Sequence, residues 1–253
     1  MSDSLRAETD EILAAGRDRI RAEAEAVAAI AAGLDDSFVS AAALIRSSPG
    51  KVITAGAGTS GPTAARLAHL LSVSGTPALT VHPADALHGT LGAVTEGDVV
   101  LVISKGGRSA EINDFARLAA ARGAAIIALT GDGSSELATA ATVAAVLPHT
   151  AQGDPGGVIA MGSSLAVAAW GDALATVLMQ ISGYPWEDVL GTHPSGAVGH
   201  RRTLPEPLPR LPEPGGSAAG TAAAAAATSA SASASTSGGA PGVSVPPEDR
   251  SDT

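Results

Sequence analysis

The sequence predicts an α/β fold in which a five-stranded parallel sheet is covered by helices on both faces. First, short β-branched runs alternate with segments of helical periodicity between residues 51 and 181. Second, residues 99–103 are five consecutive branched aliphatic residues, as expected of a strand that is buried on both faces. Third, the 253 residues are enough for one sizeable domain of this kind.

Residues 1–47 are predicted to form a helical arm. Leu13, Ile20, Val27 and Leu34 recur every seven residues, and charged residues lie largely away from that stripe. The Ser-Pro-Gly sequence at 48–50 ends the helical region. Two interpretations stay open, because four positions are too few to identify a coiled coil. The arm packs against another subunit, or it lies as an amphipathic helix on its own domain.

The alternating core is predicted within residues 48–202. Strands are expected at 51–55, 78–81, 98–103, 125–130 and 142–147, and helices at 62–74, 109–122, 134–140 and 159–181. Right-handed crossovers restrict the topology, and such sheets bind ligands beyond the carboxyl ends of their strands, where the strand order reverses. With a strand order of 2-1-3-4-5, this switch point lies between the first and third strands.

Two polar, glycine-rich turns follow those two strands, at 56–61 and 104–109. In the second turn, Ser109 is a good N-cap for the following helix. Backbone amides, hydroxyls, a helix N-terminus and the cations Lys105 and Arg108 then converge on one small volume, which favours a phosphate group. The alternative is a turn that merely reverses the chain. A dinucleotide site is a weaker alternative, because the second strand ends at His82 without an acidic residue for a ribose.

Composition excludes several other classes of protein. The net charge of −10 disfavours a nucleic-acid surface, and the lack of cysteine excludes disulfides and thiolate metal sites. Neither a signal peptide nor an apolar run of about 18 residues is recognised, so we expect a cytoplasmic protein without a membrane partner. Residues 203–253 are rich in Pro, then in Ala, Ser, Thr and Gly, and are predicted to be a disordered tail that is dispensable for folding.

Several segments lie in register with a known family. They include Gly56-x-Gly58-x-Ser60-Gly61, the sequence VHPADALHG at 81–89, GDAL at 171–174 and HPSGAVG at 193–199. Over about residues 50–201, the chain resembles the sugar isomerase (SIS) domain and, within it, the arabinose 5-phosphate isomerase branch. The resemblance implies a flavodoxin-like, three-layer αβα sandwich that binds a phosphosugar. It also implies a tetramer whose active sites lie between subunits.

Candidate site residues combine the two turns with this resemblance. The catalytic candidates are Glu111, His193 and His88. Phosphate or sugar contacts are assigned to Gly58, Thr59, Ser60, Ser104, Lys105, Gly106, Arg108, Ser109, Gln152, Ser163 and Ser164. Glu111 could act as the base, although its place in the first turn of a helix is also a common capping position. His193 and His88 could open the sugar ring or move protons between oxygens, or could be structural loop histidines.

Neither a cofactor nor a metal is expected. His82, Asp85 and His88 could be considered metal ligands, but their proline-containing loop lacks a spacing that would set coordination geometry. His69 and His149 are interpreted as ordinary surface residues.

The chain departs from the isomerase pattern at three places. Thr59 stands where those isomerases carry a lysine, residues 104–108 read SKGGR instead of SNSGE, and Gln152 stands in place of a functional glutamate. The CBS domains that commonly follow are replaced here by the predicted tail. We therefore expect a phosphosugar isomerase with a substrate other than arabinose 5-phosphate. The alternative is a non-catalytic phosphosugar-binding sensor that has lost the acid–base groups.

Overall fold

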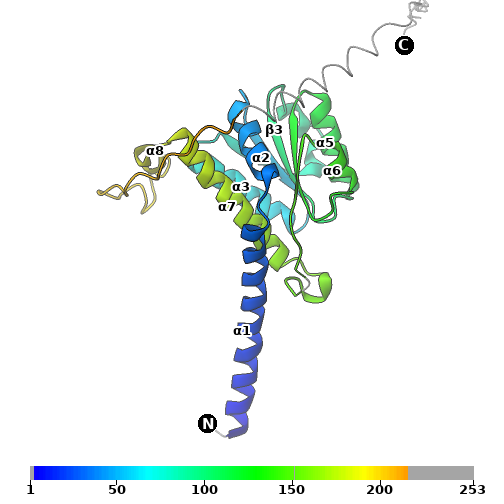
Figure 1. Cartoon of the computed structure of the whole chain (residues 1–253), viewed down its shortest axis with the longest axis vertical. Coiled ribbons are helices and arrows are strands. Elements are labelled where there is room, and N and C mark those ends of the chain that lie inside the picture. Colours follow the sequence, from blue (N-terminus) through cyan, green and yellow to red (C-terminus); the bar gives the residue numbers. More distant parts are fainter. Residues whose placement is uncertain (1–2, 151, 216–253) are drawn as a thin grey trace, which may run out of the picture. The chain divides into compact units, whose positions relative to one another are not determined.

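A computed structural model describes residues 3–150 and 152–215, and these contain one parallel five-stranded sheet (Figure 1). The strands are β1 (Val52–Gly56), β2 (Ala78–Val81), β3 (Val99–Ile103), β4 (Ala125–Thr130) and β5 (Val143–Val146). Their order is β2-β1-β3-β4-β5, and Val52 pairs with Ala78 on one side and Val99 on the other. The five predicted strands are confirmed, and the switch point lies between β1 and β3.

Helices cover both faces of this sheet. They are α1 (Asp3–Ala32), α2 (Asp36–Ser47), α3 (Ser60–Val73), α4 (Pro83–Ala86), α5 (Ala110–Ala121), α6 (Glu136–Ala140), α7 (Gly162–Ser182) and α8 (Trp186–Gly191), with 3-10 turns at Thr90–Ala93 and Pro155–Gly157. One core lies between the sheet and helices α1, α2, α3 and α7, and the other lies between the sheet and α4, α5 and α6. In β3, Leu101 faces the first core and Val102 faces the second. The predicted three-layer sandwich is confirmed.

The predicted N-terminal arm consists of two helices rather than one helical run, because α1 and α2 are bent by 75° at residues 33–35. Asp35 caps the start of α2, where its carboxylate accepts a hydrogen bond from the Ser37 amide at 2.9 Å. The end of α1 packs into the core through Ala26 and Ile30. Further towards the N-terminus, Ile12 and Ile20 are 72% and 68% exposed.

Helix α7 corrects the expectation about apolar runs. It has 21 residues and is apolar enough that, by length and composition alone, it could cross a membrane. The bent pair α1 and α2 meets the same criterion as a pair. In this fold the apolar character of α7 has another explanation, since Trp170, Leu174 and Leu178 are buried in the first core.

Asp98, just before β3, connects that strand to β1. Its buried carboxylate accepts hydrogen bonds from the Lys51 ammonium at 2.8 Å, the Lys51 amide at 3.0 Å and the Thr95 amide and hydroxyl at 2.7 and 2.9 Å. Burial by itself would raise the pKa of Asp98, but these hydrogen bonds outweigh it and lower the pKa to about 2. This stabilisation is therefore present above the unfolded-state pKa of about 4 and is lost as the pH falls through the folded-state value.

We expect Asp98→Asn to lower the free energy of unfolding near neutral pH by about 2 kcal/mol, because the depressed pKa of a buried carboxyl is itself a stability term. Urea unfolding measured across the acid range checks this expectation. The variant should lose stability less steeply than wild type between about pH 4 and pH 2. An equally steep acid limb in both proteins would show that Asp98 does not supply this pH dependence.

The proline-rich segment 204–213 lies against helices α7 and α8, where the sequence predicted disorder from residue 203 onwards. Trp186 Nε1 donates a hydrogen bond to the Glu206 carbonyl at 3.0 Å, and Gln180 Nε2 donates to the Pro209 carbonyl at 3.0 Å. The segment contains three leucines, Leu204, Leu208 and Leu211, and its prolines restrict the unfolded chain, so ordering it costs less conformational entropy. The rest of the predicted tail, residues 216–253, lies outside the described residues.

Removal of this segment should therefore be measurable. The free energy of unfolding of a chain that ends at Arg202 should be about 1–3 kcal/mol lower than that of a chain that ends at Gly215. The reason is the loss of several hydrogen bonds, each with a net contribution of about 0.5–1.5 kcal/mol. Urea unfolding of the two truncated chains is the measurement. Equal stabilities would mean that the contacts of residues 204–213 contribute nothing to folding.

Candidate active site

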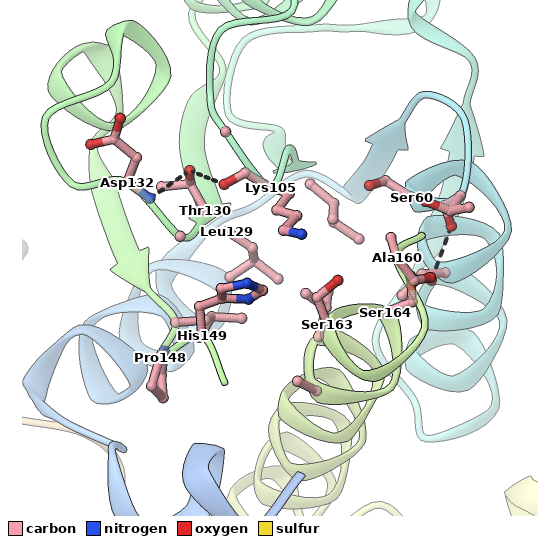
Figure 2. Close-up of a pocket in the computed structure, with 18 of the residues that line it drawn as sticks. Ser60, Lys105, Leu129, Thr130, Asp132, Pro148, His149, Ala160, Ser163 and Ser164 are labelled. Carbon is pink, nitrogen blue, oxygen red and sulfur yellow. Dashed lines mark hydrogen bonds between the residues drawn. The ribbon is translucent and has the colours of Figure 1, made fainter. Parts of the chain in front are cut away.

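A cavity of about 470 Å³ opens at the carboxyl ends of β1, β3, β4 and β5 (Figure 2). Its walls come from the first turns of α3 and α7 and from the segments that follow β3, β4 and β5. The cavity therefore includes the predicted switch point between β1 and β3.

Six of the predicted binding residues line this cavity. They are Thr59, Ser60, Lys105, Gly106, Ser163 and Ser164. The Lys105 ammonium and the Ser163 hydroxyl both point into the open space (Figure 2). The structure thus brings together the turn after β1, the turn after β3 and the start of α7, as the sequence and the resemblance predict.

The other predicted site residues do not line the cavity. They are Gly58, His88, Ser104, Arg108, Ser109, Glu111, Gln152 and His193. Ser104, just after β3, is buried and is not part of the cavity lining, and its role in phosphate binding stays a prediction. Ser109 does occupy the N-cap position of α5, but its side chain makes no capping hydrogen bond.

Arg108 is held outside the cavity by Asp132. The two side chains form an ion pair at 2.7 Å, and the Asp132 carboxylate points away from the cavity (Figure 2). Asp132 also accepts hydrogen bonds from the Ser134 hydroxyl and amide at 2.6 and 2.9 Å. These hydrogen bonds lower the pKa of Asp132 to about 2. The bond from the Ser134 hydroxyl has the largest effect, and the bond from Arg108 has the next largest. Of the two cations in this turn, only Lys105 faces the cavity.

The three predicted catalytic residues lie apart from the cavity. Glu111 is the second residue of α5 and is half-buried, whereas His88 is exposed beyond α4. His193 follows α8, where its Nδ1 atom lies 2.8 Å from the Val189 carbonyl oxygen. Gln152 has an exposed side chain, and its carbonyl accepts a hydrogen bond from Arg19 of α1. Catalytic roles for these residues stay predictions.

Asp154 is a residue of the site that sequence reasoning missed. Its buried carboxylate accepts hydrogen bonds from the Met161 and Ser163 amides at 2.9 and 3.0 Å and from the Lys105 ammonium at 2.7 Å. Burial by itself would raise the pKa of Asp154, but the hydrogen bonds from Lys105 and Ser163 outweigh it and lower the pKa. Asp154 thus connects the start of α7 to the turn after β3 and holds the Lys105 ammonium at the cavity.

The two helix N-termini at the cavity differ in charge. The first turn of α7 already donates amide hydrogens to Asp154. The first turn of α3 contains no acidic residue, and it carries Ser60 directly after Thr59. A helix N-terminus attracts anions, so an anionic group in this cavity is stabilised most where α3 begins.

Two glycines allow the close approaches that shape this cavity. Gly107 has a φ of 62°, and a Cβ atom there would lie 2.1 Å from the Ser135 hydroxyl oxygen. At Gly162 a Cβ atom would lie 2.7 Å from the Gly153 carbonyl oxygen, where the loop after β5 crosses the start of α7. A side chain at either position would displace elements that carry Lys105 or Ser163.

His149 also lines the cavity, with its imidazole pointing into the space (Figure 2). The sequence predicted a surface residue, and His149 is indeed exposed. The surface on which it lies is the wall of the cavity. The signal that could have identified it is its place just after the fifth strand, since the carboxyl ends of parallel strands share one edge of the sheet.

The folded core of the chain is similar to known proteins. Residues 44–177 match the model of the SIS domain. The chain is 37% identical over 182 residues to arabinose 5-phosphate isomerase KdsD of Pseudomonas aeruginosa, which covers 72% of this chain and 56% of that protein. It is 35% identical over 193 residues to arabinose 5-phosphate isomerase GutQ of Escherichia coli K12, which covers 76% of this chain and 60% of that protein. The chain thus spans less than two thirds of the length of these relatives.

Among solved structures, c3406 of Escherichia coli CFT073, in complex with arabinose 5-phosphate, superposes with a TM-score of 0.71 at 29% identity. That superposition covers 77% of this chain and 100% of that chain.

Proposed function

Because the chain belongs to the SIS-domain family, we propose that it is an enzyme that interconverts the aldose and ketose forms of a sugar phosphate. The observation that carries this proposal is the convergence of Lys105, Ser60 and Ser163 on one cavity at the switch point of the sheet. The arabinose 5-phosphate isomerases among its relatives support the reaction class.

The phosphate is proposed to bind at the start of α3. There the helix N-terminus is free of acidic residues, and Thr59 and Ser60 supply hydroxyls. The Lys105 ammonium supplies the positive charge, and Ser163 and Ser164 at the start of α7 also line the cavity. Because the phosphate is remote from the reacting carbons, its binding energy can position them for proton transfer.

The substrate is proposed to be a sugar phosphate other than arabinose 5-phosphate. Thr59, Lys105 and Gly106 all line the cavity, and they are positions where the chain departs from the pattern of those isomerases. Changed side chains at the phosphate and sugar contacts alter the volume and hydrogen bonding that select a substrate.

A sensor that binds a phosphosugar without converting it is the second candidate function. One observation favours it: Glu111, His88 and His193 do not line the cavity of the described chain. The first candidate accommodates this observation if residues from a second subunit complete the site.

We infer a homo-oligomer, with a tetramer as the expected size, in the cytoplasm. The support is the exposed apolar surface of α1, where Ile12 and Ile20 are 72% and 68% exposed. Light scattering at micromolar concentration should therefore give the mass of an oligomer. The double variant Ile12→Glu, Ile20→Glu should shift it towards a monomer, and a monomeric wild type would contradict the inference.

One experiment separates the two candidate functions. Tetrose, pentose and hexose aldose phosphates, arabinose 5-phosphate included, are incubated with the full chain, and formation of the ketose is followed by ¹³C NMR while binding is measured by calorimetry. An isomerase converts at least one member of the panel. Binding without conversion of any member would support the sensor, and faster conversion of arabinose 5-phosphate than of the others would refute the proposed substrate.

A further inference from the structure

Three residues with titratable side chains line the cavity: Lys105, Asp132 and His149. Two of them are engaged, because the Lys105 ammonium pairs with Asp154 at 2.7 Å and the Asp132 carboxylate pairs with Arg108 at 2.7 Å. The His149 side chain makes no hydrogen bond or ion pair with any residue in the described part of the chain, 3–150 and 152–215.

The backbone before His149 is fixed by the sheet. The Leu147 amide donates to the Thr130 carbonyl at 2.8 Å, which continues the β4–β5 ladder by one residue, and Pro148 then restricts the chain. The imidazole consequently points into the same space as the Lys105 ammonium and the Ser163 hydroxyl (Figure 2).

We propose that His149 is a catalytic residue, the group that moves the proton between carbons; this inference rests on the isomerase function proposed above. The neutral imidazole takes the proton from carbon 2 of the open-chain aldose phosphate, so that the C–H bond breaks. Its electron pair forms the carbon 1–carbon 2 double bond, and the carbonyl oxygen takes the negative charge. The hydroxyl proton moves from oxygen 2 to oxygen 1, and the imidazolium returns its proton to carbon 1. The product is the ketose, and no further reactant is needed.

The chemistry of the cavity suits this assignment. Imidazole is the side chain whose proton exchange falls near neutral pH, so it can accept and return a proton in one catalytic cycle. The phosphate is placed at the start of α3, and His149 lies across the cavity from Ser60 (Figure 2), so its imidazole faces the end of the cavity that is left for the reacting carbons. Glu111, the base that the sequence suggests, lies outside the cavity lining of the same chain.

The variant His149→Gln tests this role, because glutamine keeps a polar side chain but cannot move the proton. His69→Gln is the matched control, since His69 is an exposed histidine of α3 that does not line the cavity. The readouts are kcat with the sugar phosphate that wild type converts fastest, deuterium incorporation from D₂O, and the dissociation constant by calorimetry.

We expect His149→Gln to lower kcat and deuterium incorporation by roughly 100-fold or more, the usual contribution of a general base. The dissociation constant should change by less than about threefold, because the phosphate contacts that hold the substrate stay in place. His69→Gln should match wild type. The role is overturned if His149→Gln loses less than about tenfold in kcat, or if binding falls by the same factor as turnover. A wild type that binds the panel but converts none of it overturns the proposed function, and this role with it.

Discussion

Replacement of Lys105 by methionine is expected to weaken the binding of inorganic phosphate and of sugar phosphates by roughly tenfold to a hundredfold. The reason is the loss of a charge-assisted hydrogen bond, which contributes about 1.5–3 kcal/mol. Lys105 is the cation whose side chain points into the cavity, and Asp154 holds it there at 2.7 Å. Calorimetry with inorganic phosphate and with a sugar phosphate measures the effect.

Arg108→Met is the matched control for this variant. Arg108 belongs to the same turn and carries the same charge, but it pairs with Asp132 outside the cavity. Removal of the Arg108 side chain should change phosphate affinity by less than about threefold, because salt screens an exposed charge that lies outside the cavity. If Arg108→Met weakens binding as much as Lys105→Met does, the long-range charge of the turn matters and the cavity contact does not.

Replacement of Trp170 by alanine should lower the free energy of unfolding by about 3–5 kcal/mol, as for other buried tryptophans. Trp170 is 1% exposed at the centre of the first core, and its ring meets Phe38 edge-on, at 5.3 Å between centroids and an interplanar angle of 83°. The effect exceeds that of a surface change because a large cavity would remain between α7 and α2.

Trp186→Ala serves as the comparison in the same urea unfolding experiment. Trp186 is only half-buried, at the start of α8, and its indole donates one hydrogen bond to Glu206. It should cost about 1–2 kcal/mol. Equal losses for the two tryptophans would mean that the Phe38–Trp170 contact is not a main source of stability.

Strand and helix positions in the core were predictable because each element has a strong local signal. The continuous run of aliphatic residues at 99–103 is stable as a strand only where helices cover both faces of the sheet. The structure places this strand at the centre of the sheet. The bend between α1 and α2 was missed, although Gly33 and Asp35 carry ordinary signals for ending one helix and starting the next. The repetition of apolar residues every seven positions runs past the end of α1 to Leu34, within the bend, and so hid the end of that helix.

Part of the candidate site followed from the rule that the carboxyl ends of parallel strands share an edge. Applied to the first and third strands, this rule predicted the neighbourhood of Ser60 and Lys105. Applied to the fifth strand, it would also have identified His149. Asp154 could not be found in this way, because its partner Lys105 lies 49 residues away and only the folded loop brings them together. The exclusion of Arg108 likewise depends on Asp132, which the pattern of charges alone does not pair with it.

We propose that this SIS-domain chain catalyses proton transfer on a sugar phosphate. The most direct test is ¹H NMR of tetrose, pentose and hexose phosphates in D₂O with the full chain. The predicted result is deuterium at the carbon next to the carbonyl of at least one sugar phosphate, together with formation of its ketose or aldose isomer. Binding of these sugar phosphates without incorporation of deuterium into any of them would contradict the claim.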